Sequence, residues 1–177
     1  MQTLTKTAQI TRGTFYLHYK DKADFLLQTE RQVVDEWFFH AETITAITDT
    51  NTAAGVLQAT GFDLNAALEY ADKHHQILAT LFDTQFPRFR EYLLATLIQK
   101  LYQFGLNFEG NKQNFHMTEN EIPASYLASA FMGMVMQWLA DDRRFSYNHL
   151  GRSFAALLPS TEATRLREWF ITCNLEK

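Results

Sequence analysis

The segment TAQITRGTFYLHYKDKADFL, residues 7–26, places hydroxyl, aromatic and cationic side chains close to the first residue of the chain. Thr11 is a predicted N-cap, because its side-chain oxygen can accept a hydrogen bond from a backbone N–H of the following turn. Residues 12–19 therefore form a predicted short helix, and residues 3–8 form another before it. Two short helices joined by a tight turn describe a helix-turn-helix, whose second helix enters the major groove of DNA.

The side chains in and after this second helix have the chemistry that DNA contacts require. A guanidinium can pair with both acceptors of a guanine, and threonine offers a hydroxyl and a methyl group to base edges. Tyrosine, histidine and lysine suit phosphate oxygens, which fix register without reading sequence. The candidate DNA-binding residues are Thr11, Arg12, Thr14, Tyr16, His18, Lys20 and Lys22. In the alternative interpretation, Phe15 and Tyr19 form a core and the polar groups only cover a surface.

The charge of the chain is divided unevenly along its length. Four cations and one anion among residues 1–22 give +3, whereas 12 cations and 19 anions in the remaining 155 residues give −7. A short basic segment ahead of an acidic body is typical of a protein that meets a polyanion with one end. Chance over a short window remains the alternative.

The composition predicts an all-α fold of about nine helices in a single chain of 177 residues. Apolar residues make up 46%, while glycine and proline are scarce and strand-like alternation is hard to find. The expected domains are a partial helix-turn-helix, a connecting helix, and a helical ligand-binding and dimerisation domain, over residues 1–22, 23–46 and 47–177. The later helices are expected at 21–44, 55–73, 74–84, 87–106, 123–140, 147–158 and from residue 160 or 161 through Cys173, with polar connections at 45–54 and 107–121.

The run AQITRGTFYLHYKDKADFL resembles the N-terminal signature of the TetR family of transcriptional regulators. The residues that carry the resemblance are Ala8, Ile10, Thr11, Gly13, Thr14, Phe15, Tyr16, Tyr19, Lys20, Asp21, Lys22, Asp24 and Leu26. The resemblance implies phosphate contacts by Tyr16 and Lys22, and base or nearby phosphate contacts by Thr11, Arg12 and Thr14. It also implies that Phe15 and Tyr19 hold the small domain together.

Two departures from the family pattern carry expectations of their own. The turn has Gln9 where the family has glycine, which costs roughly 1 kcal/mol if this residue is left-handed. The family also has a long helix ahead of the two short ones, and residues 1–2 are too short to supply it. A DNA-binding region without that helix is expected to be loose or differently arranged.

The segment IPASYLASAFMGMVMQWLADD resembles the penultimate, dimerising helix of one TetR subgroup. It is apolar nearly all round, so it must be buried nearly all round. Pairing with a second copy in a four-helix packing would bury it, and a central helix in a monomer is the alternative. The predicted dimer residues are Leu127, Phe131, Met132, Met134, Val135, Met136, Trp138, Leu139 and Phe154.

Aromatic residues of the central helices could line a cavity for a small apolar effector, although such residues also form ordinary cores. The candidates are Trp37, Phe38, Phe82, Phe86, Phe89, Tyr102 and Phe108.

Several other classes of protein have no signal in the sequence. No nucleophile elbow, phosphate loop, dinucleotide glycine motif or metal-binding histidine spacing occurs, so no enzyme, cofactor or metal is expected. No apolar run is long enough to cross a bilayer, and the single cysteine fits a reducing cytoplasm. The prediction is therefore a cytoplasmic homodimer that binds operator DNA, as a repressor under effector control. The alternative is an all-α dimer that binds small molecules or protein but no DNA.

Overall fold

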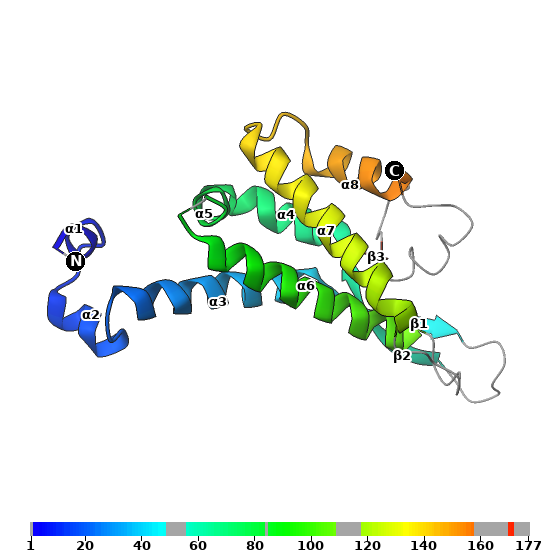
Figure 1. Cartoon of the computed structure of the whole chain (residues 1–177), viewed down its shortest axis with the longest axis horizontal. Coiled ribbons are helices and arrows are strands. Elements are labelled where there is room, and N and C mark those ends of the chain that lie inside the picture. Colours follow the sequence, from blue (N-terminus) through cyan, green and yellow to red (C-terminus); the bar gives the residue numbers. More distant parts are fainter. Residues whose placement is uncertain (1, 49–55, 84, 109–117, 158–169, 172–177) are drawn as a thin grey trace. The chain divides into compact units, whose positions relative to one another are not determined.

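The computed structural model describes residues 2–48, 56–83, 85–108, 118–157 and 170–171. These residues form eight helices and one small sheet, so the predicted all-α class is confirmed with eight helices instead of about nine. The helices are α1 (Gln2–Thr7), α2 (Arg12–His18), α3 (Lys22–Ala41), α4 (Leu64–Lys73), α5 (His75–Leu81), α6 (Pro87–Phe108), α7 (Thr118–Ala140) and α8 (Tyr147–Leu157) (Figure 1). The chain divides into two compact units, Met1–Glu36 and Trp37–Lys177, and the boundary falls inside α3.

The second unit is a helical body in which α6 packs along α7 and α4 packs along α8 (Figure 1). Asp63 caps α4, because its Oδ1 accepts the backbone N–H of Ala66 at 2.9 Å. Buried aromatic rings connect the elements: Phe131 of α7 lies 5.5 Å from Phe62 and 6.1 Å from Phe154 of α8, between ring centroids. An ion pair between Arg143 and Asp72, at 2.7 Å, joins the turn after α7 to the end of α4.

A three-stranded sheet in the body was not predicted from the sequence. Strand β1 (Glu42–Thr48) pairs antiparallel with β2 (Val56–Asp63), and β2 pairs parallel with β3 (Phe170–Ile171). The register places Glu42 opposite Phe62. The segment ETITAIT is rich in threonine and isoleucine, whose β-branched side chains favour strands, so interpreting it as a helix end and a loop was wrong.

Other helix boundaries also differ from the sequence-based expectations. Helix α3 ends at Ala41, and α4 begins only at Leu64 because β2 occupies the preceding residues. Helix α7 begins at Thr118, so Pro123 lies inside it rather than at its start. The predicted last helix falls mostly outside the described residues, and its described part, Phe170–Ile171, is strand β3 instead.

Close packing between α4 and α8 depends on Gly151. A Cβ at this position would lie 2.6 Å from Asn65 Oδ1 and 3.3 Å from Leu68 Cδ1. We expect Gly151→Ala to lower the free energy of unfolding of the body by about 1–3 kcal/mol, because the added methyl group overpacks the contact. Urea denaturation of the full chain measures this change.

Ser153→Ala is the matched control, since Ser153 is an exposed residue of the same helix. This change should raise the free energy of unfolding by up to about 0.5 kcal/mol through helix propensity. Equal stabilities for the two variants would show that the Asn65 side chain moves aside at no cost.

Candidate functional site

The turn between α1 and α2 is a Schellman motif that places Gln9 in the left-handed region. The N–H of Gln9 donates to Lys6 O at 3.2 Å, and the N–H of Ile10 donates to Thr5 O at 3.0 Å. Gln9 has φ 53°, which is the conformation that the family's glycine would adopt without strain. The condition under which a residue other than glycine is strained at this position is therefore met.

Replacing Gln9 by glycine should stabilise this turn. We expect Gln9→Gly to raise the opening free energy of the α1 amides by up to about 1 kcal/mol, because the Cβ that strains the left-handed backbone is removed. Hydrogen exchange of the full chain measures that free energy. Ala8→Gly is the control: its φ is not positive, so the extra backbone freedom should destabilise α1. A loss of protection in both variants would contradict the strain at Gln9.

Helix α2 begins with the predicted threonine cap. Thr11 Oγ1 accepts the N–H of Thr14 at 3.1 Å, and the two hydroxyl oxygens lie 2.9 Å apart. The cap makes α2 begin at Arg12 and orients both threonine side chains at the exposed start of the helix. Both side chains remain exposed, and each hydroxyl oxygen keeps capacity for a further hydrogen bond.

Three aromatic rings, from α2, the residue that caps its end, and α3, make a small core in the first unit. Phe15, which is only 1% exposed, lies 5.1 Å from Tyr19 and 5.8 Å from Phe25, and Tyr19 lies 4.9 Å from Phe25, all between ring centroids. Two of these pairs are tilted and the pair of Tyr19 with Phe25 is edge-on, which is a favourable arrangement for aromatic rings. The cluster anchors α2 on the start of α3 and fixes which side of α2 faces outward.

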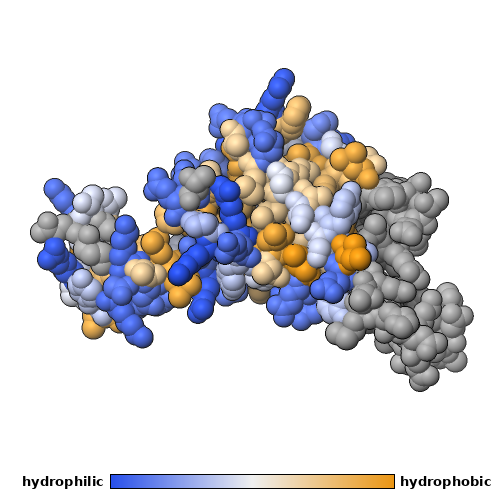
Figure 2. Space-filling view, in the orientation of Figure 1, coloured by the Kyte–Doolittle hydropathy of each residue, from blue (hydrophilic) through white to orange (hydrophobic). Residues whose placement is uncertain are grey.

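The exposed residues of α2 and of the segments on either side of it form the candidate DNA-binding surface. Successive helical residues are rotated by about 100°, so Gly13 and Leu17 lie opposite Phe15. All seven predicted DNA-binding residues are exposed: Thr11, Arg12, Thr14, Tyr16, His18, Lys20 and Lys22. Figure 2 shows mostly hydrophilic residues over α1 and α2 on the face in view. Within the described residues, none of the four cations of this region forms an ion pair.

Leu17 belongs to the same surface and was not predicted from the sequence. It is 83% exposed, in the middle of the side that points away from Phe15. Counting residues from the buried Phe15 could have identified it, but an apolar residue in a short helix is usually read as core. An exposed leucine can contact the methyl group of thymine in the major groove.

Two carboxylates organise the start of α3. Asp21 Oδ1 accepts the N–H of Asp24 at 2.8 Å, and Asp24 Oδ2 accepts the N–H of Lys20 at 2.9 Å. The hydrogen bond from the Lys20 backbone N–H, together with one from the Gln28 side-chain amide, holds the pKa of Asp24 below its ordinary value. The reciprocal pair therefore fixes the backbone that carries Lys20 and Lys22, and this fixing is lost when acid protonates Asp24.

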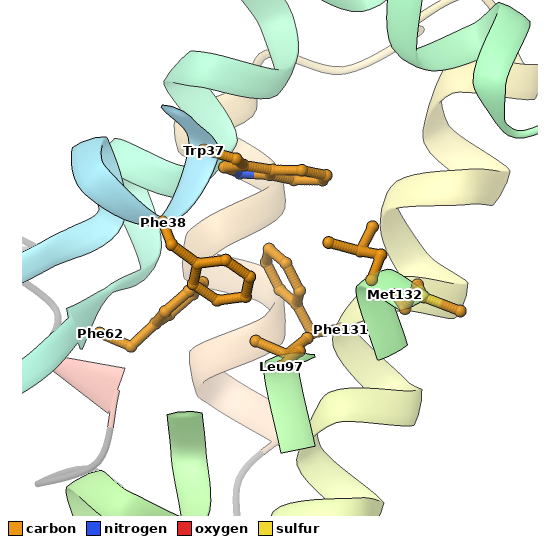
Figure 3. A pocket seen from close by; sticks show the side chains of 7 residues that line it. Trp37, Phe38, Phe62, Leu97, Phe131 and Met132 are labelled. Carbon is orange, nitrogen blue, oxygen red and sulfur yellow. The ribbon is translucent and has the colours of Figure 1, made fainter. Parts of the chain in front are cut away.

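The body contains a small apolar cavity between α3, β2, α6 and α7 (Figure 3). Its volume is about 10 Å³, which is space for one water molecule. The indole N–H of Trp37 donates to Ala67 O at 2.8 Å, so it does not offer a donor to the cavity. The wall is made by Trp37, Phe38, Phe62, Leu93, Leu97, Phe131 and Met132.

The seven aromatic residues predicted for a pocket divide between this wall and other places. Trp37 and Phe38 line the cavity. Phe82 and Phe89 pair edge-on at 5.3 Å between centroids and are not lining residues, and neither are Phe86 and Tyr102. The side chain of Phe108 lies outside the described residues. The sequence did not identify Phe62, Leu93, Leu97, Phe131 and Met132, because no pattern along the chain brings these elements together.

Most residues predicted for a dimer interface are buried inside their own chain. The buried ones are Leu127, Phe131, Val135, Trp138, Leu139 and Phe154, whereas Met132, Met134 and Met136 are half-buried. A side chain that its own chain already buries has little surface left for a second copy. The exposed side of α7 runs instead through Ile122, Tyr126, Ser129, Gly133 and Gln137, at helical spacing.

In the part of the chain that the structure describes, no group of three or more histidine, cysteine, aspartate or glutamate side chains could hold a metal ion. No described helix is long and apolar enough to cross a membrane.

A comparison with protein families shows what the second unit is similar to. A family model described as a transcriptional regulator C-terminal region, of the TetR type, matches residues 63–159, which is more than half of the chain. Comparison with curated proteins and with solved structures gives no significant match. The matched segment begins at Asp63, the cap of α4, and contains every helix from α4 to α8. The chain belongs to the TetR family of transcriptional regulators.

Proposed function

We propose that the chain is a one-component repressor that binds operator DNA as a homodimer and releases it when a small apolar effector binds. In this proposal residues 1–22 contact DNA, residues 23–46 connect, and residues 47–177 dimerise and hold the effector. The observation that supports this proposal is that α2 is anchored by one buried side chain and exposes its polar side chains. Phe15 is buried on one side, while Arg12, Thr14, Tyr16 and His18 are exposed on the others.

Within this surface we assign different roles to the start of α2 and to the start of α3. Arg12 lies in the first turn of α2, where a guanidinium can reach a guanine edge. Lys22 is the first residue of α3, where an ammonium suits a phosphate oxygen. Base contacts carry sequence discrimination, and phosphate contacts carry affinity that depends on salt.

The two roles predict different losses for two alanine variants. Arg12→Ala should weaken binding to the preferred operator by about 1–3 kcal/mol and relax one base position. Lys22→Ala should weaken binding to every DNA sequence by the same factor, and it should make the affinity depend less steeply on salt concentration. Fluorescence anisotropy with the preferred operator and a scrambled duplex, across a salt titration, measures both effects.

Arg31→Ala is the matched control, because Arg31 is an exposed arginine of α3 outside the proposed surface. It should bind like the unchanged chain. If Arg12→Ala lowers the affinity for both duplexes equally, Arg12 does not contact a base. Absence of specific binding by the unchanged chain would favour the alternative, a dimer that binds small molecules or protein but no DNA.

The exposed side of α7 supports the homodimer. Ile122 and Tyr126 are large and exposed, and Ser129 and Gly133 are small, so a second helix could approach closely along this side. The half-buried Met132 and Met136 flank it. Two-fold pairing would present two α2 helices to a pseudo-palindromic operator. Sedimentation of the operator complex should give two chains per duplex, and one chain per duplex would contradict the dimer.

The cavity supports effector control. Its wall is apolar, and it must widen to admit a molecule larger than water, since ligand pockets have volumes of roughly 300–1,000 Å³. A ligand that binds only the widened body must also change the affinity for DNA, if the two conformations differ in DNA affinity. Occupation of the cavity should therefore weaken operator binding.

A further inference from the structure

We propose that the effector is an apolar chain that ends in a carboxylate, and that its carboxylate takes the place of Glu42 on Lys100. This inference rests on the proposed function, in which the effector occupies the cavity. The wall supplies only carbon, sulfur and an indole N–H that Ala67 O already accepts. The buried part of the ligand must therefore be apolar, because a polar group there would lose its hydrogen bonds to water without replacement.

Helical spacing brings one cation to the edge of this wall. Leu93, Leu97 and Lys100 follow one another at i, i+4 and i+7 on α6, so they share one side of the helix. The two leucines line the cavity. Lys100 Nζ lies 5.9 Å from the centroid of the Phe38 ring, which is itself part of the wall. The ammonium of Lys100 therefore lies beside a side chain that lines the cavity.

The ammonium of Lys100 is already paired with the carboxylate of Glu42. It forms an ion pair and hydrogen bond with Glu42, and the two side chains are 34% and 31% exposed. A pair at this depth is partly shielded from water, so a charge of either sign left alone there would be unfavourable. A ligand carboxylate satisfies Lys100 as Glu42 does, and Glu42 can then turn to solvent. A neutral apolar ligand cannot make this exchange.

The exchange also connects binding to a change in the body. Glu42 is the first residue of β1 and directly follows α3, which supplies Trp37 and Phe38 to the wall. The pair with Lys100 therefore holds the end of α3 against α6. Widening the cavity separates these elements, and a ligand carboxylate on Lys100 replaces the contact that is lost.

Octanoate and 1-octanol test the proposal, because they have the same chain length and differ in charge at pH 7. Isothermal titration calorimetry of the full chain should give an affinity ratio of octanoate to octanol that falls roughly fivefold in Lys100→Met, the effect of one partly exposed ion pair. Methionine keeps the apolar stem over Phe38. Glu42→Gln should raise the affinity for octanoate by roughly fivefold and the affinity for octanol by a similar factor, because it removes the pair that opposes widening, and it should leave their ratio unchanged.

Lys73→Met is the matched control. Lys73 is paired with Glu69 on exposed α4 positions, at 2.6 Å, and does not contact the wall. It should leave the ratio unchanged. Octanol binding with an unchanged ratio in Lys100→Met would overturn the carboxylate site and leave the effector cavity standing. Failure of both ligands to bind the unchanged chain would overturn the cavity together with this proposal.

Discussion

Replacing Phe15 by alanine should unfold the first unit while the body stays folded. Phe15 is 1% exposed and contacts both other rings of the small core, so its removal should cost about 3–5 kcal/mol. A unit of this size has little stability beyond that amount. Hydrogen exchange should show loss of protection over residues 2–36 and unchanged protection in α6 and α7, and operator binding should be lost.

Leu17→Ala separates stability from recognition in the same helix. Leu17 is exposed, so its truncation should change the stability of the first unit by no more than about 0.5 kcal/mol. It should nevertheless weaken operator binding if the leucine contacts a thymine methyl group.

Unchanged hydrogen exchange of the first unit in Phe15→Ala would show that the three rings are not the core of this unit.

Replacing Phe131 by alanine should cause the largest loss of stability in the body. The ring is 3% exposed, lines the cavity, and lies 6.4 Å from Trp37 and 5.5 Å from Phe62 between centroids. We expect the free energy of unfolding to fall by about 3–5 kcal/mol, because the lost contacts leave a void that joins the existing cavity. Urea denaturation measures this loss, and benzene should restore part of it by filling the void.

Phe39→Ala is the control for Phe131→Ala. Phe39 is 80% exposed at the end of α3, so the same change there should cost no more than about 0.5 kcal/mol. If benzene does not raise the stability of Phe131→Ala, the surrounding side chains have collapsed into the void.

Local signals in the sequence predicted the parts of the fold that depend on local interactions. The caps at Thr11 and Asp21 gave the starts of α2 and α3 within one residue, because a cap requires only a side chain and the next turn. Gln9 was identified in a different way, because it stands where the family pattern has glycine, and its φ is 53°. The proposed DNA-binding surface of α2 is also formed by neighbouring residues, so the sequence was enough to predict its candidate residues.

Features that depend on distant partners could not be predicted in this way. Strand β1 needs β2 to complete its hydrogen bonds, and a threonine-rich segment without a visible partner is usually read as a loop. The cavity wall combines four elements that are far apart in sequence. The apolar stripes of α7 correctly indicated burial, but a stripe does not show whether its own chain or a second copy covers it.

Trp37 can serve as a natural fluorescent probe of the cavity, because its indole lines the wall and is held in place by a hydrogen bond. The indole forms part of the cavity wall, stacks near Tyr70 at 6.0 Å between centroids, and has its N–H fixed on Ala67 O. Any molecule that enters the cavity changes the polarity and the quenching groups around this one chromophore. Intrinsic tryptophan emission, with a Trp37→Phe chain as the blank for the other two indoles, can therefore follow occupancy without a label during a titration or a stopped-flow experiment.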